Sequence, residues 1–396
     1  MHIFNLENIQ NNLKKLNLDG WLIYDFRGSN DLALEVLNIP KTSHLTRRFY
    51  YFIPQSGSPI KIVNEIEAGH LNHLPGDKYT YSSYDSLNEH LNKISGAAKK
   101  VAMEYSPKNN IPYVSKVDAG TIEYISSLGI EIKSSGDLIS KFAAIWSHEQ
   151  FEENRPVAIA LTEIVKEAFD FIGERLTNDK KTNEYEVQQL IMRKFKENKL
   201  VTDFPPIVGV NENSSNPHYA PDENHHKNIN MGDFVLIDLW AKTDKPDAVW
   251  SDITWTGYTE HSIPEKYTRV FDVVAEARDA AFNLVASRFS EGKEVRGFEV
   301  DDAARKVIER EGFGKYFFHR TGHSITTELH GSGANMDNYE THDERLILPS
   351  TSFSIEPGIY LPDFGIRSEI DVYISPDGKV MATGKEIQRE VFPIIR

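Results

Sequence analysis

The sequence has 396 residues and a formal net charge of −15, with 40% hydrophobic and 11% aromatic residues. This length favours two domains over one, and the apolar content suffices for a sizeable core, so global disorder is excluded. The acidic balance disfavours binding to nucleic acid or to an anionic membrane. Because cysteine is absent, disulfides, thiolate catalysis and thiolate metal sites are excluded.

The N-terminal segment MHIFNLENIQNNLKKLN lacks a basic stretch followed by an apolar run. No part of the chain has about 18 uninterrupted apolar residues, the length that a membrane helix needs. We therefore expect neither a signal peptide nor a membrane span, and we predict a cytoplasmic protein.

The first part of the chain, residues 1–146, alternates between helical and strand patterns. One helical face is apolar at Leu6, Ile9, Leu13 and Leu16. Further on, the patterns predict strands at 20–26, 48–54, 59–65 and 100–105, a helix within 115–128 and a strand at 130–133. This alternation predicts an α/β domain with a mixed sheet, and no glycine-rich phosphate-binding motif interrupts it.

A long helix is predicted to begin near Glu149 and to continue past Pro156. Proline is tolerated in a first helical turn and breaks a helix interior, so a boundary is expected within 147–156. Later helices are predicted after Asn183 and after Ser262, each with a capping partner three residues on. The chain then becomes strand-rich, which indicates an α+β half with helices on an antiparallel sheet.

Four carboxylates and one histidine lie in strand-like or tight-loop segments of this second half. They are Asp238 in FVLIDLWAK, Asp252 in VWSDITWT, His323 in HRTGHSITTELH, Glu356 in SIEPGIY and Glu369 in GIRSEIDVYI. Hard oxygen ligands with one imidazole are the donor set of a pair of divalent cations. The set therefore favours a two-metal hydrolase.

The acidic residues also occur in mirrored pairs. Asp238 and Asp252 flank Lys245 symmetrically, so a symmetric hairpin would place them opposite each other with Cβ atoms ~5 Å apart. Glu356 and Glu369 are symmetric about the turn LPDFG in the same way. Like charges opposed within a buried sheet are destabilising, and a cation between them removes the repulsion.

The charge of this cluster indicates the number of ions. One divalent ion would leave the four carboxylates partly uncompensated in a low-dielectric site, whereas two ions neutralise them and can hold a bridging hydroxide. The ligand types favour manganese, cobalt, iron or zinc over copper.

Assembled in order, the five segments resemble the creatinase/methionine-aminopeptidase superfamily of metallopeptidases, and within it the Xaa-Pro branch of aminopeptidase P and prolidase. The resemblance covers the chain from about residue 150 and, by size and layout, the part before it. It implies a smaller α/β creatinase/prolidase-like domain at 1–147. A pita-bread catalytic domain, with helices on a curved antiparallel sheet, is implied at 148–396.

The resemblance implies roles for the five ligand candidates. Asp238 would hold one metal ion, Asp252 and Glu369 would bridge both, and His323 and Glu356 would complete the second. Glu356 would also act as general base and then as proton donor. The expected cofactor is two manganese ions, with cobalt, zinc or iron as alternatives.

Four further positions match accessory residues of the family: His218 in NPHYAP, His319 and His330 around His323, and Arg367 two residues before Glu369. The histidines would contact substrate or stabilise the tetrahedral intermediate, although His319 could instead pack beneath the ligand loop. Arg367 would lie in the active site, or would orient a ligand carboxylate.

Other polar residues near these segments are expected to be solvated: His225 and His226 in DENHHK, and Asp244 and Asp247 in the turn between the aspartates. The sequence departs from the family pattern in a longer hairpin, in Trp255 where arginine is common, and in GHSIT, with Ser324 and Thr326, where GHGIG is usual. Because the loop after His323 would line the specificity pocket, these departures leave substrate preference open.

The leading prediction is dinuclear hydrolysis of Xaa-Pro bonds by a metal-bridging hydroxide, on short peptides with proline in the second position. Aminopeptidase and dipeptidase remain alternatives. A metal-dependent hydrolase or lyase of a non-peptide small molecule, and a binding protein without catalysis, are the competing interpretations. Relatives imply a homodimer, while partners among nucleic acids and membranes are not expected.

Overall fold

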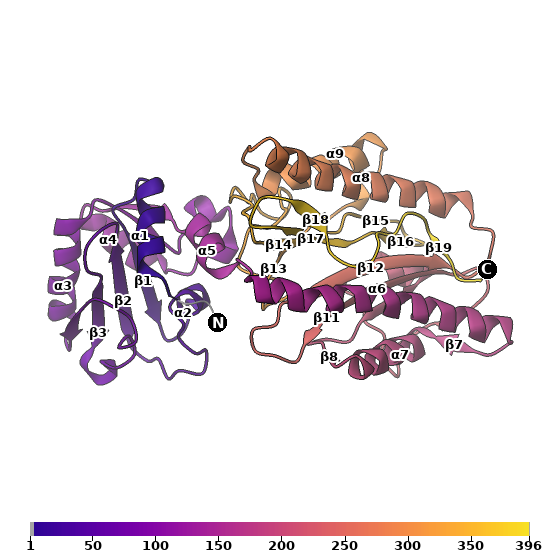
Figure 1. Ribbon diagram of the computed structural model, residues 1–396, viewed down its shortest axis with the longest axis horizontal. Helices are drawn as coiled ribbons and strands as arrows, with labels where there is room; N and C mark the ends of the chain where they lie inside the picture. The colour runs from indigo at the N-terminus through magenta and orange to yellow at the C-terminus, as the bar shows by residue number, and fades with distance from the viewer. Residues whose placement is uncertain (1–3, 396) are drawn as a thin grey trace. The chain divides into compact units, whose positions relative to one another are not determined.

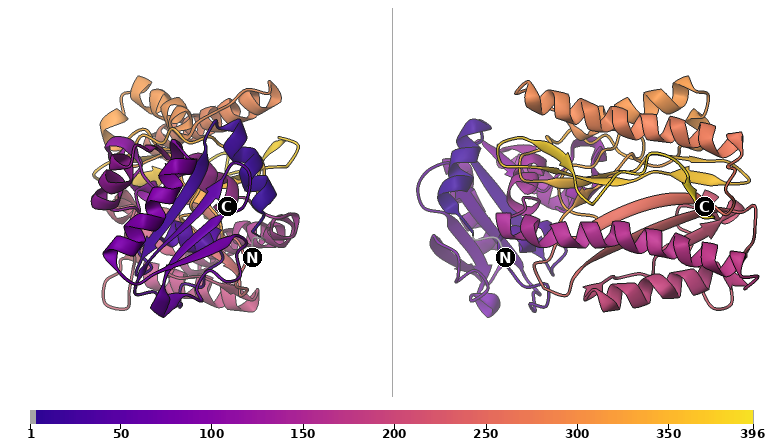
Figure 2. Two further views of the ribbon diagram at one scale, coloured as in Figure 1. Left: turned by 90° about the vertical axis from the view of Figure 1, so that its left-hand side faces the viewer. Right: turned by 45° about the vertical axis from the view of Figure 1, so that its right-hand side comes forward.

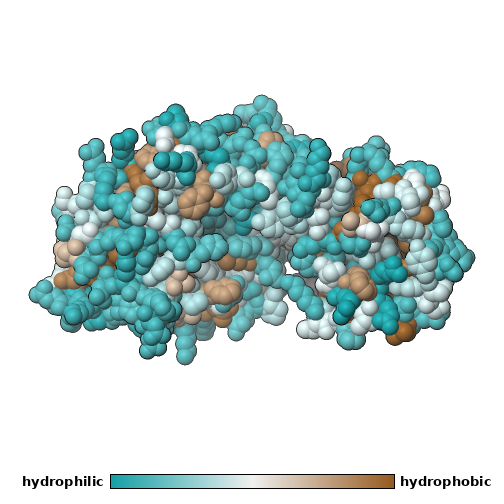
Figure 3. Space-filling model, turned by 180° about the vertical axis from the view of Figure 1, so that it is seen from behind, coloured by the Kyte–Doolittle hydropathy of each residue, from teal (hydrophilic) through white to brown (hydrophobic). Residues whose placement is uncertain are grey.

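The computed structural model describes residues 4–395. The chain divides into two compact units, Met1–Ala143 and Ala144–Arg396, a few residues before the boundary expected at 147/148. Hydrophilic side chains cover most of the face shown in Figure 3, with smaller apolar patches between them. Among the described helices, none is both long and apolar enough to cross a lipid bilayer.

The N-terminal unit contains a six-stranded sheet in the order β4-β3-β2-β1-β5-β6. Its strands are β1 (Gly20–Phe26), β2 (Arg48–Pro54), β3 (Ile60–Asn64), β4 (Asp77–Tyr81), β5 (Lys100–Met103) and β6 (Glu131–Ser134). Strand β2 is antiparallel to both neighbours, whereas β1–β5, β5–β6 and β3–β4 are parallel. The sheet is therefore mixed, as the sequence predicts.

Helices cover both faces of this sheet (Figure 1). The first face carries α1 (Leu6–Lys15), α2 (Asp31–Val36) and α5 (Gly136–Ala143), and the second carries α3 (Tyr84–Ala97) and α4 (Ala119–Ser127). Trp21 and Ile23 of β1 pack toward the first face, while Leu22 and Tyr24 pack toward the second. A strand that is buried on both sides shows a continuous apolar run, which explains why β1 and β2 were predictable.

The second unit begins with the long helix α6 (His148–Thr177). Ser147 and Gln150 form its capping box, and Pro156 lies in the helix interior rather than in its first turn. The missing N–H of proline removes one backbone hydrogen bond, and burial of Val157, Leu161 and neighbouring apolar residues offsets that loss.

Three more helices follow: α7 (Glu184–Glu197), α8 (Glu265–Ser290) and α9 (Gly297–Arg310). Asn183 caps α7 as predicted, but the Glu186 side chain pairs with Arg175 and does not complete the expected capping box. The cap predicted at Ser262 is wrong, because α8 begins later and Pro264, which has extended backbone angles, is its N-cap. Helix α9 was not predicted.

Strands form the middle layer of this unit, with α8 and α9 on one side and α6 and α7 on the other (Figures 1 and 2). One sheet has the order β19-β12-β11-β8, with β9 also paired to β11, and another has the order β13-β14-β17-β18. Two-stranded pairs are formed by β10 with β7 and by β15 with β16.

The bounds of these strands are β7 (Thr182–Asn183), β8 (Leu200–Val201), β9 (Ile207–Val210), β10 (Asn228–Ile229), β11 (Phe234–Thr243), β12 (Ser251–Tyr258), β13 (Ser324–Ile325), β14 (Ser352–Ile355), β15 (Gly358–Tyr360), β16 (Gly365–Arg367), β17 (Ile370–Ile374), β18 (Val380–Ala382) and β19 (Phe392–Pro393).

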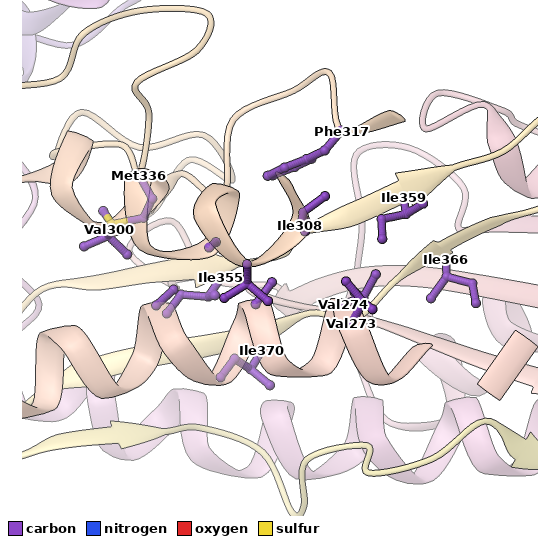
Figure 4. Close-up of a cluster of buried hydrophobic side chains, with 14 of the residues drawn as sticks. Val273, Val274, Val300, Ile308, Phe317, Met336, Ile355, Ile359, Ile366 and Ile370 are labelled. Carbon is purple, nitrogen blue, oxygen red and sulfur yellow. The ribbon is translucent and has the colours of Figure 1, made fainter. Parts of the chain in front are cut away.

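Apolar side chains between α8, α9 and the strands form the largest core cluster of this unit (Figure 4). Val274 of α8 and Ile308 of α9 are fully buried there with Ile355 of β14 and Ile366 of β16. Ile355 and Ile366 each stand next to a predicted site residue in the sequence. The core therefore fixes the backbone from which the site residues project.

Candidate metal centre

The hairpin of β11 and β12 carries both predicted aspartates on one face. The ladder pairs Asp238 with Thr254 and Asp252 with Trp240, so the direct pairing of the two aspartates predicted from Lys245 is wrong. The symmetry axis lies one residue later than expected, which makes the aspartates diagonal neighbours. Because side chains alternate along a strand, Asp252 and Thr254 share a face, and Asp238 lies opposite Thr254 on that face.

Glu356 and Glu369 lie between two ladders that keep the same register. Ile355 pairs with Ile370 on one side of them, and Gly358 pairs with Arg367 on the other. Continuation of that register places Glu356 opposite Glu369, as the mirrored spacing predicts. Both residues leave the regular ladder at this point, so their side chains can turn toward the aspartates.

His323 is held between Gly322 and β13 by close contact with β14. A Cβ added at Gly322 would lie 1.9 Å from the Ser354 carbonyl oxygen, so only glycine permits this approach. The His323 N–H donates to Ser354 Oγ at 3.0 Å, and the Ser354 N–H donates to the His323 carbonyl at 2.9 Å. Its Nε2 then lies 3.5 Å from Glu356 Oε1 and 3.8 Å from Asp252 Oδ2.

Three of the predicted ligands form a compact donor group. Asp252, His323 and Glu369 each offer one ligand atom, and these atoms all lie within 4.8 Å of one another. All three side chains are buried, with Asp252 at 5% and Glu369 at 3% exposure. The Glu356 carboxylate lies next to His323 of this group, and Asp238 is linked to the group by its ion pair with Arg367.

The buried oxygens of this cluster are incompletely satisfied. Asp238 Oδ1, Asp252 Oδ1 and Glu369 Oε1 are buried and have no hydrogen-bond partner within the described residues. A buried carboxylate oxygen without a donor or a cation is costly. The donor set, the burial and the unpartnered oxygens together fit bound divalent cations.

The pKa shifts of these groups in the metal-free protein also favour bound divalent cations. Burial, together with repulsion from Glu369 and Asp238, raises the pKa of Asp252 well above its usual range. Burial raises the pKa of Glu356 to about 7, although the Arg367 charge opposes the rise. Burial lowers the pKa of His323 well below its usual range, so its imidazole is neutral and able to ligate.

Arg367 connects the acidic residues. Its Nη2 donates to Asp238 Oδ2, and its Nε donates to Thr254 Oγ1 at 2.9 Å. Thr254 Oγ1 in turn donates to Glu369 Oε2 at 2.7 Å. The guanidinium thus fixes one oxygen of Asp238 while the other stays unpartnered, which is the arrangement expected of a residue that orients a ligand.

His319 belongs to a hydrogen-bond chain that ends on Arg367. Its Nδ1 lies 2.7 Å from the Arg320 carbonyl, which can only accept, so Nδ1 carries the proton and Nε2 accepts from Tyr360 Oη at 2.7 Å. Tyr360 Oη accepts from Arg367 Nη1 at 3.2 Å. Burial lowers the pKa of His319 to about 3, and both of its nitrogens are engaged by the protein.

The other two predicted histidines lie toward the outside of the cluster. The His330 ring meets the His323 ring edge-on, with centroids 4.5 Å apart, and part of its surface is exposed to solvent. Partial burial, with the charge of Arg320, lowers the pKa of His330 to about 4. His218 is exposed and interacts electrostatically with His330.

The departures from the family pattern fall in two different places. Trp255 lies on the opposite face of β12 from Thr254 and packs in the core beneath α6, with Lys166 Nζ 5.3 Å from its ring. Ser324 Oγ accepts from the Gly333 N–H at 3.1 Å, and Thr326 Oγ1 accepts from the Glu328 N–H at 3.2 Å. These hydroxyls hold the loop that carries His330, whereas Trp255 is not at the site.

The residues expected to be solvated are at the surface. Asp244 and Asp247 are exposed in the hairpin turn. His225 is exposed and forms a hydrogen bond with the Asp222 carboxylate, and the His226 ring stacks on the ring of Tyr185.

Sequence reasoning missed Thr254, Tyr360 and Asp371. Asp371 Oδ2 accepts from the Asp252 N–H at 2.8 Å, and its other oxygen is buried without a partner within the described residues. Thr254 and Asp371 each stand two residues after a predicted ligand, so strand alternation could have placed them on the ligand face. Nothing in the local sequence indicates that Tyr360 reaches Arg367.

A family comparison covers more than half of the chain. Residues 157–376 match the model of metallopeptidase family M24. The Xaa-Pro dipeptidase of Pyrococcus furiosus is 26% identical over 307 residues, which cover 77% of this chain and 78% of that protein. The putative dipeptidase YkvY of Bacillus subtilis is 34% identical over 181 residues, so the match spans 45% of that relative.

Solved structures share the fold over nearly the whole length. A dipeptidase from Pyrococcus horikoshii has 25% identity and a TM-score of 0.59, and the match covers 98% of this chain and 99% of that one. Dipeptidase PepE from Mycobacterium ulcerans has 18% identity and a TM-score of 0.66, with 99% and 97% coverage. The chain therefore belongs to metallopeptidase family M24, which confirms the resemblance inferred from its sequence.

Proposed function

We propose that this protein hydrolyses the bond before proline in short peptides, with two divalent metal ions as cofactor. The observation that carries the proposal is the convergence of buried carboxylates with unpartnered oxygens on a neutral histidine. Relatives named as Xaa-Pro dipeptidases support the substrate class.

We assign five side chains to the two ions. Asp238 would hold one ion, Asp252 and Glu369 would contact both, and His323 with Glu356 would complete the second. When bound, such a pair activates water and polarises a carbonyl. Manganese is the expected metal, with cobalt, zinc or iron as alternatives.

Glu356 is suited to carry the proton. In the metal-free protein burial raises its pKa to about 7, so the site allows this carboxyl to hold a proton near neutral pH. In the proposed reaction its carboxylate takes a proton from the attacking water and releases it afterwards. The receiving group is the departing nitrogen of proline, which becomes a secondary amine when the C–N bond breaks. Ser354 Oγ donates to Glu356 Oε1 at 3.1 Å, which limits the orientation of the carboxylate.

The accessory residues then divide into two groups. His330 and His218 retain exposed surface and are available to contact a peptide. His330 is neutral and can donate one hydrogen bond to the oxygen on which charge develops. His319 acts through Tyr360 on Arg367, and we assign it a positioning role.

A dedicated site for such bonds has a physical reason. Proline has no amide hydrogen, so peptidases that bind the hydrogen of the scissile amide handle these bonds poorly. The choice between aminopeptidase and dipeptidase rests on whether a third residue is accepted. The homodimer and the cytoplasmic location remain predictions.

The test combines metal analysis with a substrate series. Wild-type protein is loaded with manganese, cobalt or zinc and assayed on Ala-Pro, Ala-Pro-Ala and the control dipeptide Ala-Ala. Asp252→Asn removes one charge from the cluster, and Asp244→Asn is its matched control in the same hairpin. We expect Asp252→Asn to lose bound metal and turnover together, while Asp244→Asn keeps both.

Turnover of Ala-Pro alone would indicate a dipeptidase, and release of alanine from Ala-Pro-Ala would indicate an aminopeptidase. Hydrolysis of Ala-Ala at an equal rate would contradict the proline specificity. No turnover of any peptide by protein that binds two ions would contradict the peptidase proposal and would favour a non-peptide substrate.

A further inference from the structure

A cleft of about 700 Å³ opens in the N-terminal unit, on the face of the sheet that α3 and α4 cover. Tyr24 and Tyr50 lie side by side at its base, with ring centroids 4.9 Å apart. Tyr84 and Leu87 of α3 line one side, and Tyr124 of α4 lines the other. Pockets for small molecules have this size, and they combine aromatic and apolar lining residues with a few polar groups, as this cleft does. No residue of the metal centre belongs to it.

The cleft lies at the carboxyl edge of the sheet. Strands β1, β3, β4, β5 and β6 run in one direction, and α3 and α4 follow β4 and β5, so both helices begin at that edge. Ser83 and Gly120, at the starts of the two helices, are among its lining residues. Open α/β sheets bind ligands at this edge, and helix N-termini favour negative charge there.

Two arginines at the start of β2 add positive charge. Arg47 and Arg48 line the cleft, because β2 runs antiparallel and begins at the same edge. The Arg48 guanidinium interacts electrostatically with Tyr24, Tyr50 and Tyr81. Burial raises the pKa of these phenols further above their ordinary value of 10, so they stay neutral and do not compensate the Arg48 charge. None of the ion pairs found between described residues includes Arg48.

The acidic residue in the lining has a structural role. Asp118 is the N-cap of α4, and its oxygens accept from the Thr121 N–H at 2.9 Å and from Thr121 Oγ1 at 2.7 Å. Hydrogen bonds from Thr121, stronger together than the opposing burial, lower the pKa of Asp118. The lining therefore holds two positive charges, Arg47 and Arg48, and one negative charge, Asp118, whose oxygens already accept hydrogen bonds at the start of α4. This balance suits a ligand with a single negative charge.

We propose that this cleft binds a small organic monoanion, namely a carboxylate attached to an aromatic or apolar body. The carboxylate accepts hydrogen bonds from Arg48, and the body lies against Tyr24, Tyr50 and Tyr124. A dianion is disfavoured by Asp118, and a neutral ring leaves the Arg48 charge uncompensated.

The test uses the full chain in EDTA, so that carboxylates do not bind through added metal. The probe is 3-phenylpropionate, and 3-phenylpropanamide is its neutral analogue of the same shape. Binding is measured by calorimetry and by ligand-observed NMR. We expect the carboxylate to bind about tenfold more tightly than the amide, because only the carboxylate forms a charge-assisted hydrogen bond with Arg48.

Variants locate the site. Arg48→Gln is expected to reduce carboxylate affinity to that of the amide, and Arg47→Gln, at an exposed position, is expected to reduce it about threefold. Tyr84→Ala should weaken both probes equally, because this exposed ring lines the cleft and has no charge that would distinguish the carboxylate from the amide. Lys14→Gln in α1, on the other face of the sheet, is the matched control and should change neither affinity.

Three results would overturn the proposal. Equal affinity for carboxylate and amide would show that no positively charged side chain binds the carboxylate group. Unchanged carboxylate binding in both arginine variants would place the anion elsewhere, for instance among the histidines of the second unit. Absence of binding of either probe by the wild type would show that the cleft is not a ligand site. Thermal unfolding of each variant identifies one that fails to fold, in which case the other arginine variant decides.

Discussion

Buried carboxylates occur in both units, and they differ in how their oxygens are satisfied. Glu104, in the N-terminal unit, is fully buried. It accepts hydrogen bonds from Trp21 Nε1 at 2.7 Å, Asn30 Nδ2 at 2.9 Å and Ser135 Oγ at 3.1 Å. This carboxylate has neutral donors on both oxygens and stabilises the packing of β1, α2 and α5.

The cluster in the second unit has the opposite character. Asp238, Asp252 and Glu369 lie close together, repel one another, and each keep one buried oxygen without a partner in the described residues. Burial raises the pKa of Glu104 as well as those of the cluster, so burial alone does not identify a metal site. Convergence and unpartnered oxygens make the distinction.

Removing the proposed proton carrier, Glu356, should produce the largest effect. Glu356→Gln keeps the volume of the side chain and loses its proton transfer, so we expect kcat to fall about 10³-fold. Glu104→Gln, the same change at the satisfied carboxylate, should leave kcat within a factor of two or so. Steady-state kinetics on an Xaa-Pro peptide measure both effects. Similar losses of kcat in the two variants would contradict the functional difference between the two buried carboxylates.

The pH dependence of stability should differ with and without metal. The folded-state pKa of Glu356 is about 7 against an ordinary 4.5. Its contribution to the stability of the metal-free protein is therefore at its maximum below pH 4.5, where the carboxyl is protonated. That stability is lost as pH rises through 7, and the loss is about 3 kcal/mol.

Urea unfolding at several pH values in EDTA measures this slope. Manganese should reverse its sign, because cations bind the ionised carboxylates. Glu356→Gln in EDTA is the control and should lack the fall in stability that Glu356 contributes between pH 4.5 and 7. The histidines of the site, whose pKa burial lowers, add a slope of opposite sign in both proteins, so only the difference between wild type and Glu356→Gln is diagnostic. A wild type that gains stability relative to Glu356→Gln from pH 5 to pH 7.5 in EDTA would contradict the raised pKa of Glu356.

Truncation of the satisfied carboxylate should affect stability only. Glu104→Ala leaves Trp21 Nε1 and one Asn30 donor bond without an acceptor in the interior, which should cost about 2–3 kcal/mol in the free energy of unfolding. Metal content should remain that of the wild type. Loss of metal in this variant would mean that the two carboxylate groups are coupled.

The chain from Arg367 to His319 should have a smaller influence. Tyr360→Phe removes the hydroxyl that connects them, so we expect kcat/KM to fall about tenfold while metal content is unchanged. Tyr339→Phe, at an exposed tyrosine, is the control. If Tyr360→Phe lost metal instead, the hydroxyl would be needed to hold Asp238 in place through Arg367.

The smallest effect is expected at Trp255. Trp255→Phe should destabilise the fold by about 1 kcal/mol through lost packing, because the side chain faces the core beneath α6. The ratio of rates on different Xaa-Pro peptides should not change. A changed ratio would show that the core face of β12 affects the site.

Much of the fold follows from local pattern. Strands β1 and β2 begin and end where their apolar runs do, since both faces are buried. Helix α9 carried a usable signal in Val300, Ala304, Val307 and Ile308, whose spacing is helical. The register of β11 and β12 could not be read from symmetry, because loop residues shift the axis of a hairpin without changing the pattern of either strand.

The sequence alone determined which chemical groups this protein has and which segments carry them: five candidate ligands, carboxylates and one imidazole, in strand-like segments and one tight loop. Only the tertiary structure decided which carboxylate oxygens lack donors, which carboxyl has a pKa near neutrality, and that Tyr360 joins His319 to Arg367. The reason is that burial and charge act through space, and the residues that set them come from elements far apart in the chain.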